Sequence, residues 1–276
     1  MNALETRTRA ARAAGRKLLV PYVTGGVTGN WTDLLRAAVD AGADAIEIGL
    51  PFSDPILDGP VVQESSHRAL LRGVTTRQIL DEVTRLTLPV PLIAFTYANL
   101  VLHAGADRFC AALADAGVDG LIVPDLPVDE IEPVSTAAAG NRVDLALLAS
   151  PATTPQRLHE IATRSRGFVY AVSVMATTGE QSTVGAAGER LVTSLRQVTD
   201  LPVVLGFGIS GPQQAAQAGG YADGVAVGSA LMRRVLDGAS AVQFGDFLTQ
   251  LRTALDETGG RWRAAPQAVR TTPVAR

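Results

Sequence analysis

The residues best suited to chemistry lie in one stretch, Asp44 to Pro60, which reads DAIEIGLPFSDPILDGP. Glu47 alternates with Ile46 and Ile48, so the pattern predicts a buried strand with Glu47 near its carboxyl end. Burial of a carboxylate raises its pKa, and a raised pKa suits a general acid or base at neutral pH. The alternative is a structural ion pair between Glu47 and an arginine, because such pairs also bury carboxylates.

A second acid, Asp58, follows in the loop after this strand. Its Asp-Gly-Pro sequence is also typical of a helix start, with Asp58 or Gly59 as the N-cap and Pro60 in the first turn. A second carboxylate beside the first would give an acid–base site two independently tuned groups. Both interpretations of Asp58 stay open from the residues alone, although a cap needs one residue and the loop also carries Ser53 and Asp54.

The elements that must position these acids are short apolar strands alternating with longer helices, which is the pattern of a parallel α/β fold. Strands are expected at 18–23, 45–49, 91–96, 120–123, 143–148, 167–173, 203–206 and 224–227. Helices are expected at 31–41, 61–72, 76–86, 106–116, 130–139, 155–165, 189–198, 212–218, 231–236 and 241–257.

Eight strand–helix units in about 250 residues predict a (β/α)₈ TIM barrel, with active-site residues at the carboxyl ends of the strands. An Ala/Arg-rich segment over residues 1–15 adds an extra N-terminal helix. No linker interrupts the repeat, so we expect one domain over residues 1–258. The remaining residues, 259–276, are poor in apolar side chains and are expected to form a mobile tail.

Glycines follow each of the last three predicted strands and suggest a phosphate cradle. Thr178-Gly179, the segment 206–210 with Gly208, and Gly228-Ser229 occupy these three loops. Glycine lets backbone N–H groups approach an anion, and a helix that begins at Ser229 would direct its positive end toward it. Phosphate sites of this fold use these loops. A single glycine of this kind would be equally typical of a plain turn.

Apolar and aromatic residues at the predicted strand ends indicate a pocket for a flat apolar group. In a chain with 5% aromatic residues, six such positions fall at one barrel mouth, although each alone could be core packing. They are Tyr22, Phe52, Phe95, Tyr97, Ile122 and Phe207.

Composition narrows the chemistry. Lys17 is the only lysine and precedes the first strand, which rules out a Schiff-base mechanism at the other end of the barrel. Cys110 is the only cysteine, and His67, His103 and His159 lack the spacing of metal ligands, so no metal site is predicted.

A net charge of -3 provides no basic field for nucleic acid or an anionic membrane. No apolar run is long enough to span a membrane, so we expect a cytosolic protein.

Taken together, the motifs resemble the tryptophan synthase alpha chain family. The resemblance runs from about Leu18 to Leu251, and it rests on GADAIEIGLPFSDPILDGP, YANLV from Tyr97, PDLPVDE from Pro124, LGFGIS from Leu205 and VGSA from Val227. It implies retro-aldol cleavage of indole-3-glycerol phosphate to indole and glyceraldehyde 3-phosphate, in the biosynthesis of L-tryptophan.

The resemblance also implies residue roles. Glu47 would protonate indole C3, Asp58 would hold the indole N–H, and Tyr170 would lie beside the catalytic glutamate. The phosphate would bind at Gly179, Gly208, Gly228 and Ser229. The indole pocket would contain Tyr22, Phe95, Tyr97, Ile122 and Phe207, with Thr178 in the lid.

A partner is implied as well: a pyridoxal-phosphate-dependent beta chain in an α₂β₂ heterotetramer, with no cofactor in this chain. The loop Pro51 to Pro60, Asn99 and Pro127 match the partner-facing positions. The loop after the sixth strand departs from the family pattern, with Ala176 in place of a flexible glycine and no basic residue, and Gly26-Val27-Thr28 replaces a common aspartate. Two alternatives therefore stay open, namely a stand-alone lyase that releases free indole and a mainly allosteric, weakly catalytic partner of the beta chain.

Overall fold

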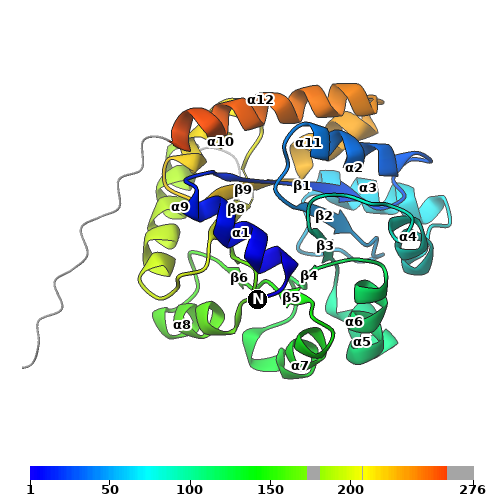
Figure 1. The fold of residues 1–276 in the computed structure, drawn as a ribbon, viewed down its shortest axis with the longest axis horizontal. Helices are drawn as coiled ribbons and strands as arrows, with labels where there is room; N and C mark the ends of the chain where they lie inside the picture. The colour runs from blue at the N-terminus through cyan, green and yellow to red at the C-terminus, as the bar shows by residue number, and fades with distance from the viewer. Residues whose placement is uncertain (173–180, 207, 260–276) are drawn as a thin grey trace, which may run out of the picture.

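The computed structural model describes residues 1–172, 181–206 and 208–259. Its described strands form one sheet in the order β5-β4-β3-β2-β1-β9-β8-β7-β6, and every pairing is parallel (Figure 1). The strands are β1 (Leu18–Thr24), β2 (Ile46–Gly49), β3 (Leu92–Phe95), β4 (Gly120–Ile122), β5 (Asp144–Leu145), β6 (Leu148–Ala149), β7 (Val169–Val172), β8 (Val203–Gly206) and β9 (Gly224–Val227).

The sheet closes on itself through the segment that contains β5 and β6. β5 pairs with β4, whereas β6 pairs with β7, at the two ends of the strand order. Between them, the Ala146 N–H donates to the Leu121 carbonyl at 3.0 Å, and the Tyr170 N–H donates to the Leu147 carbonyl at 3.0 Å. One segment thus serves both edges, so the single strand expected at 143–148 is two short strands. Counted as one position, they give the eight-stranded barrel that the sequence predicts.

Helices surround the barrel (Figure 1). The described ones are α1 (Ala3–Ala13), α2 (Trp31–Asp40), α3 (Pro60–Leu71), α4 (Thr76–Val83), α5 (Ala98–Ala104), α6 (Ala106–Asp115), the 3₁₀ turn η1 (Val128–Glu130), α7 (Glu132–Gly140), α8 (Pro155–Arg164), α9 (Gln181–Arg196), α10 (Pro212–Gly219), α11 (Ser229–Leu236) and α12 (Ala241–Gly259).

Two helices differ from the expectation. α5 was not predicted, because it is short and is separated from α6 only by Gly105, whose φ of 84° turns the chain. α9 begins at Gln181 rather than at residue 189. A Cβ at Gly188 would lie 3.3 Å from the Tyr221 hydroxyl oxygen and 3.4 Å from a Leu205 methyl carbon, so this glycine permits close helix packing instead of ending the helix.

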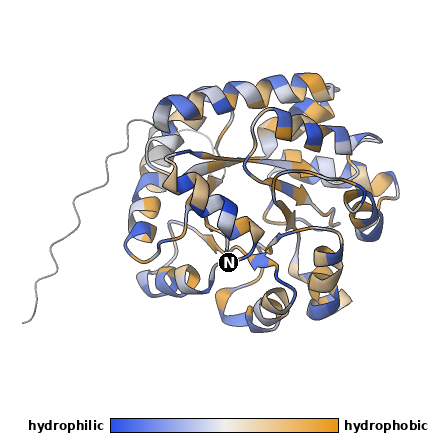
Figure 2. Cartoon of the chain, viewed as in Figure 1, coloured by the Kyte–Doolittle hydropathy of each residue, from blue (hydrophilic) through white to orange (hydrophobic). Residues whose placement is uncertain are grey.

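The core follows from the apolar strands. Every residue of β1, β2, β3, β8 and β9 is buried, and the largest fully buried side chains include Trp31, Phe168 and Phe244. Figure 2 shows the central strands largely in hydrophobic colours, whereas the surrounding helices alternate between hydrophobic and hydrophilic residues. This arrangement is the one that amphipathic helices adopt around a parallel sheet buried on both sides.

The extra N-terminal helix, α1, covers the amino end of the barrel. Leu4 is fully buried and packs against Gly120 and Gly167. A Cβ atom at either glycine would lie within 2.8 Å of the Leu4 side chain, so a larger residue would not fit there. The Thr8 hydroxyl donates to the Gly167 carbonyl at 2.6 Å. Asp144 of β5 accepts hydrogen bonds from the N–H of Glu5 at 2.9 Å and from the side chain of Asn2 at 2.8 Å. The carboxyl ends of the strands lie at the opposite end of the barrel.

The expected domain bounds, 1–258, stay a prediction, and the expected tail lies almost wholly in residues 260–276, outside the described residues. Within the described part of the chain, no helix combines the length and apolar character that a membrane crossing requires.

Candidate active site

A cavity of about 260 Å³ lies at the carboxyl ends of the strands. It brings together both predicted acids, Tyr170 and three of the predicted phosphate-binding residues. Its wall consists of Tyr22, Glu47, Asp58, Gly59, Val62, Phe95, Tyr170, Gly208, Ile209, Ala226, Gly228 and Ser229.

Glu47 enters the cavity from β2, where it is in register with Tyr22 of β1 and Ile93 of β3. Glu47 is 1% exposed, and its Oε1 atom has no hydrogen-bond partner among the described residues. Burial raises the pKa of Glu47 to about 8. No arginine of the described chain forms an ion pair with it, so the structural ion-pair interpretation finds no support. At neutral pH Glu47 therefore holds a proton that it can donate.

Asp58 faces the same cavity from the loop between β2 and α3. Burial raises its pKa to about 6, and a hydrogen bond from the Tyr97 hydroxyl partly offsets this effect. The Tyr97 oxygen also accepts the N–H of Leu57 at 3.1 Å. The N-cap of α3 is Gly59, without any side-chain capping bond, and Pro60 is in the first turn. The predicted helix start is therefore confirmed with Gly59 as its cap, and the interpretation of Asp58 as the cap is wrong. The two acids thus have different pKa values in one cavity.

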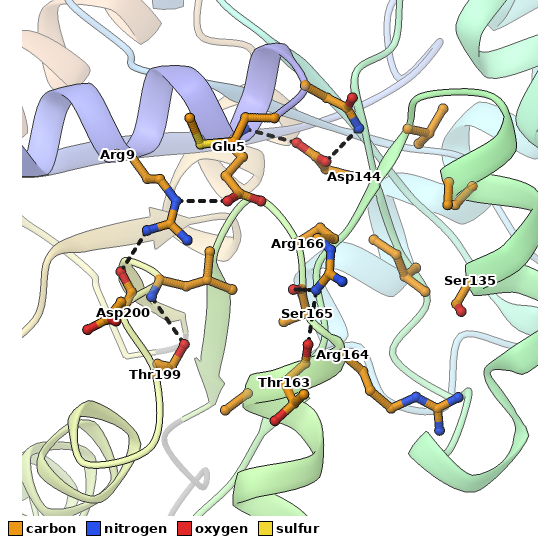
Figure 3. Close-up of a pocket in the computed structure, with 18 of the residues that line it drawn as sticks. Glu5, Arg9, Ser135, Asp144, Thr163, Arg164, Ser165, Arg166, Thr199 and Asp200 are labelled. Carbon is orange, nitrogen blue, oxygen red and sulfur yellow. Dashed lines mark hydrogen bonds and ion pairs between the residues drawn. The ribbon is translucent and has the colours of Figure 1, made fainter.

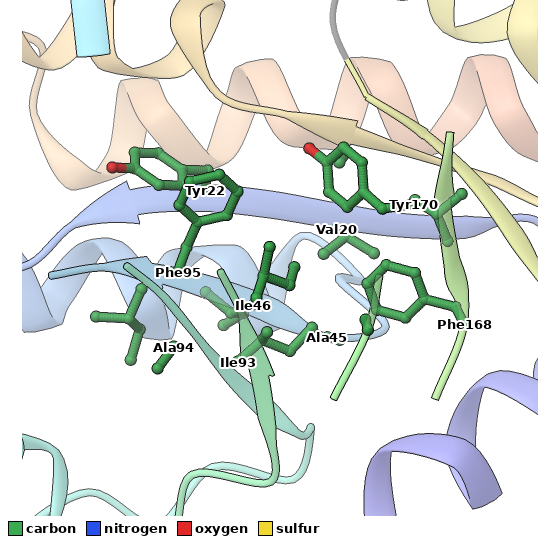
Figure 4. Packing of buried hydrophobic residues seen from close by; sticks show 14 of the residues in the cluster. Val20, Tyr22, Ala45, Ile46, Ile93, Ala94, Phe95, Phe168 and Tyr170 are labelled. Atoms are coloured by element: carbon green, nitrogen blue, oxygen red, sulfur yellow. The ribbon is translucent and has the colours of Figure 1, made fainter. Parts of the chain in front are cut away.

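Two tyrosine rings occupy space that glycines leave open. A Cβ at Gly49 would lie 1.9 Å from the Tyr22 hydroxyl oxygen, and a Cβ at Gly206 would lie 2.1 Å from a ring carbon of Tyr170. Phe95 meets Tyr22 edge-on, with ring centroids 5.8 Å apart (Figure 4). Burial raises the pKa of both tyrosines, and the nearby carboxylates raise it further, so both phenols stay protonated.

Three predicted pocket residues, Phe52, Tyr97 and Ile122, lie outside the cavity wall. Tyr97 stacks on Phe52, with centroids 5.2 Å apart, and supports Asp58 from outside the cavity wall. Ile122 is fully buried in β4, where it pairs with Phe95, and belongs to the barrel core. Strand-end position alone did not reveal which face of the strand each side chain takes. Thr178, Gly179 and Phe207 lie outside the described residues.

The predicted phosphate-binding residues that the structure describes line one side of the cavity. α11 begins at Ser229 with Gly228 as its N-cap, so the amino end of this helix, where backbone N–H groups point outward, lies at the cavity edge. Gly208 has a φ of 81°, a conformation that favours glycine. A Cβ at Gly59 would lie 3.9 Å from the Ser229 hydroxyl oxygen, so the loop of Asp58 faces the start of α11.

The sequence interpretation missed four residues of the wall: Gly59, Val62, Ile209 and Ala226. Ala226 could have been found from the alternation of β9, since it lies two residues before Gly228. Ile209 lies inside the quoted LGFGIS motif. Val62 is an apolar residue in the first turn of α3. Such residues normally pack against the barrel, so the sequence did not indicate that Val62 also lines the cavity.

A larger cavity, about 610 Å³, lies at the amino end beneath α1 (Figure 3). Its charged side chains are bonded within the protein: Arg9 Nε contacts Glu5 Oε1 at 2.8 Å, and Arg166 donates to the carbonyls of Thr163 and Ser165. Lys17 also lies at this end and donates to the Ala222 carbonyl at 2.8 Å. Neither predicted acid reaches this cavity, so the smaller one is the candidate active site.

The fold is that of a TIM-barrel enzyme, and the cavity at the carboxyl ends of its strands holds two acids whose surroundings suit acid–base chemistry. The chain belongs to the tryptophan synthase alpha chain family, because the family model of that description matches residues 8–252. It is a carbon–carbon lyase of tryptophan biosynthesis, in the role of the alpha subunit.

Relatives and solved structures agree. The tryptophan synthase alpha chain of Synechococcus sp. (strain CC9902) is 42% identical over 266 residues, which cover 92% of this chain and 98% of the relative. That of Picosynechococcus sp. (strain ATCC 27264 / PCC 7002 / PR-6) is 44% identical over 246 residues, or 87% and 93% of the two chains.

The crystal structure of tryptophan synthase subunit alpha from Legionella pneumophila str. Paris matches with a TM-score of 0.85 at 31% identity, covering 93% of this chain and 99% of that one. A ligand-free tryptophan synthase from M. tuberculosis gives a TM-score of 0.84 at 35% identity, covering 92% and 99%. The family resemblance expected from the motifs is confirmed.

Proposed function

We propose that Glu47 and Asp58 carry out the retro-aldol cleavage of indole-3-glycerol phosphate in this cavity. The observation that carries the proposal is the burial of Glu47 without an ion-pair partner among the described residues, which raises its pKa to about 8. Glu47 donates its proton to indole C3. As a carboxylate it then accepts the proton of the glycerol hydroxyl next to the ring, while the carbon–carbon bond breaks and its electrons return to the ring. Indole and an aldehyde result, and Glu47 is protonated again.

Asp58 takes the complementary role. Its pKa of about 6 leaves it ionised at neutral pH, where Glu47 is protonated. The ionised carboxylate accepts the indole N–H and stabilises the positive charge that forms when C3 is protonated. Tyr97 holds Asp58 in place through its hydroxyl. Tyr170 lies on the cavity wall near Glu47, where it would border the reacting part of the substrate.

The phosphate of the substrate would bind at Gly208, Gly228 and Ser229. The N-terminus of α11 and the glycine backbone support this assignment, because exposed N–H groups and the helix dipole favour an anion there. Gly179 and Thr178 remain part of the proposed binding site and lid on the family resemblance alone. Tyr22 and Phe95 would contact the indole ring from the cavity wall.

A beta chain would dock over the loop Pro51 to Pro60. Two side chains of this loop, Ile56 and Leu57, are 78% and 48% exposed, and Leu102 on the neighbouring α5 is 54% exposed. Asn99 and Pro127, the other predicted contact positions, are also exposed. Exposed apolar residues beside an active site are typical of a protein interface. We propose the α₂β₂ heterotetramer, with pyridoxal phosphate in the beta chain and no cofactor in this one, located in the cytosol.

The test is indole release from indole-3-glycerol phosphate by the purified chain, with and without a tryptophan synthase beta chain. Slow release that rises many-fold with the partner supports the proposal. Fast release at a rate that does not change when the beta chain is added would indicate a stand-alone lyase. Stimulation of the beta chain without indole formation would indicate a mainly allosteric role. Glu47→Gln is the matched control, because it keeps the shape of the side chain but removes the transferable proton.

Among the described residues, no group of three or more His, Cys, Asp or Glu side chains is arranged to hold a metal ion. The proposed mechanism assigns each proton transfer to side chains of this protein.

A further inference from the structure

A row of three hydroxyl groups lies behind the cavity wall, on Tyr22, Thr24 and Ser65. We propose that Thr24 and Ser65 are positioning residues that hold Asp58 and the Tyr22 ring in register with Glu47. The proposal rests on the proposed function, because it concerns the geometry of the same site. Neither Thr24 nor Ser65 lines the cavity, so both would act through their neighbours.

The contacts of Ser65 are short and fully buried. Thr24 Oγ1 lies 2.6 Å from Ser65 Oγ, and the Ser65 hydroxyl donates to the Val62 carbonyl at 2.8 Å. Thr24 Oγ1 also lies 3.4 Å from the Tyr22 hydroxyl. Thr24 and Ser65 are both 0% exposed. Ser65 gives its one proton to Val62, so the single Thr24 proton supplies either the 2.6 Å bond to Ser65 or the 3.4 Å contact with Tyr22, and the shorter bond is the stronger of the two. Breaking such a bond in the interior leaves a polar group without a partner.

The Thr24–Ser65 contact joins two elements that lie next to the acids, namely β1, which pairs with the strand of Glu47, and α3, which follows the loop of Asp58. Ser65 belongs to α3, which starts directly after Asp58 and Gly59. Thr24 ends β1, the strand that pairs with β2 through Tyr22 and Glu47. The contact therefore fixes α3, and with it the loop of Asp58, to the strand beside Glu47.

The start of α3 needs such an anchor. Its N-cap, Gly59, has no side chain to bind the first turn, whereas the next helix, α4, has a complete capping box from Thr75 and Gln78. Val62, whose carbonyl accepts the Ser65 hydroxyl, itself lines the cavity. A shift of α3 would thus move Val62 and Asp58 together relative to Glu47.

Tyr22 lies against the same Thr24 hydroxyl. Its ring lies between the edge of Phe95 and the space above Gly49, and its hydroxyl oxygen is within 3.4 Å of the Thr24 hydroxyl, which can donate to it. This position presents the ring as part of the cavity wall. Loss of the Thr24 hydroxyl would free the ring to turn about its side-chain bonds, which loosens the surface against which a substrate ring would lie.

The experiment compares Ser65→Ala, Thr24→Val and the double variant in indole release. We expect each single variant to lower kcat by about 5- to 20-fold with KM changed by less than about 2-fold, because a small misplacement of reacting groups slows the chemical step. The kcat of the double variant should lie within about 2-fold of that of the slower single variant, because both substitutions remove the same bond. Thr24→Ser keeps the hydroxyl and should retain at least about half of the wild-type kcat.

Ser165→Ala is the matched control. Ser165 is also 0% exposed, accepts the Leu147 N–H at 2.8 Å and donates to the Phe168 carbonyl at 3.2 Å, but it lies at the amino end of the barrel. It should lower the melting temperature about as much as Ser65→Ala and leave kcat unchanged.

Three results would overturn the inference. Variants that melt earlier but keep the wild-type kcat would show a purely structural role. Effects on kcat that multiply in the double variant would show that the two residues act separately. A Thr24→Ser variant as slow as Thr24→Val would exclude the hydroxyl, and this pair decides the matter if Ser65→Ala does not fold. If the wild-type chain releases no indole, alone or with a beta chain, the proposed function is overturned as well. If the wild type is active and Ser65→Ala has the same kcat, only this inference is overturned.

Discussion

Asp44 and Glu47 are buried acids only three positions apart, but their surroundings differ. Asp44, just before β2, is 0% exposed and is bound by Arg16 at 2.7 Å, by Arg252 at 3.2 Å and by the Leu19 N–H at 3.0 Å. Glu47, within β2, is 1% exposed and has no ion pair within the described chain. A buried carboxylate with charged partners stabilises the fold, whereas one without them keeps its proton and is available for reaction.

The largest expected effect comes from Glu47→Gln. It should lower kcat by about 10³- to 10⁴-fold, because no other described residue of the cavity wall has both the position and the pKa to protonate indole C3. The rate is measured by indole release with the beta chain present. An undiminished rate would remove Glu47 from the mechanism.

The same variant should change the pH dependence of stability in a defined direction. The folded chain binds the Glu47 proton more tightly than the unfolded chain, since the pKa rises from 4.5 to about 8. Stability from this group is therefore complete below about pH 4.5 and is lost as the pH rises to about 8. The urea midpoint of the wild type should fall relative to that of Glu47→Gln between pH 5 and about pH 8.5.

Asp44→Asn should have the next largest effect, and on stability rather than activity. Arg252 is 7% exposed and would lose its buried counter-charge, at a cost of about 3–4 kcal/mol in the free energy of unfolding. kcat should stay within about 2-fold of the wild type at temperatures where the variant is folded. Asp33→Asn is the control, because its pair with Arg36 is exposed and should contribute less than about 1 kcal/mol. An Asp44→Asn variant with a reduced kcat but an unchanged free energy of unfolding would contradict the structural role of Asp44.

Asp58→Asn should slow indole release by about 10²-fold, because a neutral amide cannot balance the charge on the protonated indole. The wild-type rate should also fall below about pH 6, where Asp58 becomes protonated, and above about pH 8, where Glu47 loses its proton. The variant should lose the acid limb of this profile and keep the basic limb. A pH–rate profile of kcat for both proteins provides the measurement, and an unchanged acid limb would argue against this role.

Gly49→Ala should have the smallest effect of the set. The added Cβ would lie 1.9 Å from the Tyr22 hydroxyl oxygen, so the ring must move away from Thr24. Overpacking of this kind costs about 1–3 kcal/mol, and KM should rise because Tyr22 lines the cavity. Gly140→Ala, with open space around the new methyl group, is the control. Thermal melting and substrate saturation curves measure the two effects.

The sequence was sufficient for the barrel and for the pair of acids. Each strand position is an apolar run, and the carboxyl ends of parallel strands meet at one face, so Glu47 and the loop of Asp58 had to lie together. The split of the strand at 143–148 was not predictable, because it depends on closure of the sheet between β4 and β7.

The supporting contacts were not predictable either. Tyr97 was expected in the pocket, but its hydroxyl binds Asp58 from outside. Thr24 and Ser65 are 41 positions apart, and only the packing of α3 on β1 brings their hydroxyls to 2.6 Å. A hydroxyl group in a sequence shows a capacity to form hydrogen bonds but does not identify the partner.

The position of α1 has a consequence for the order in which the chain is assembled. Its first residues are synthesised first, yet their partners come much later: Asn2 binds Asp144, Thr8 binds the carbonyl of Gly167, and Arg12 binds the carbonyl of Asp200. Contacts across such sequence separations form slowly, because the intervening chain must be ordered first. During translation, α1 can therefore close the amino end of the barrel only after most of the barrel has left the ribosome.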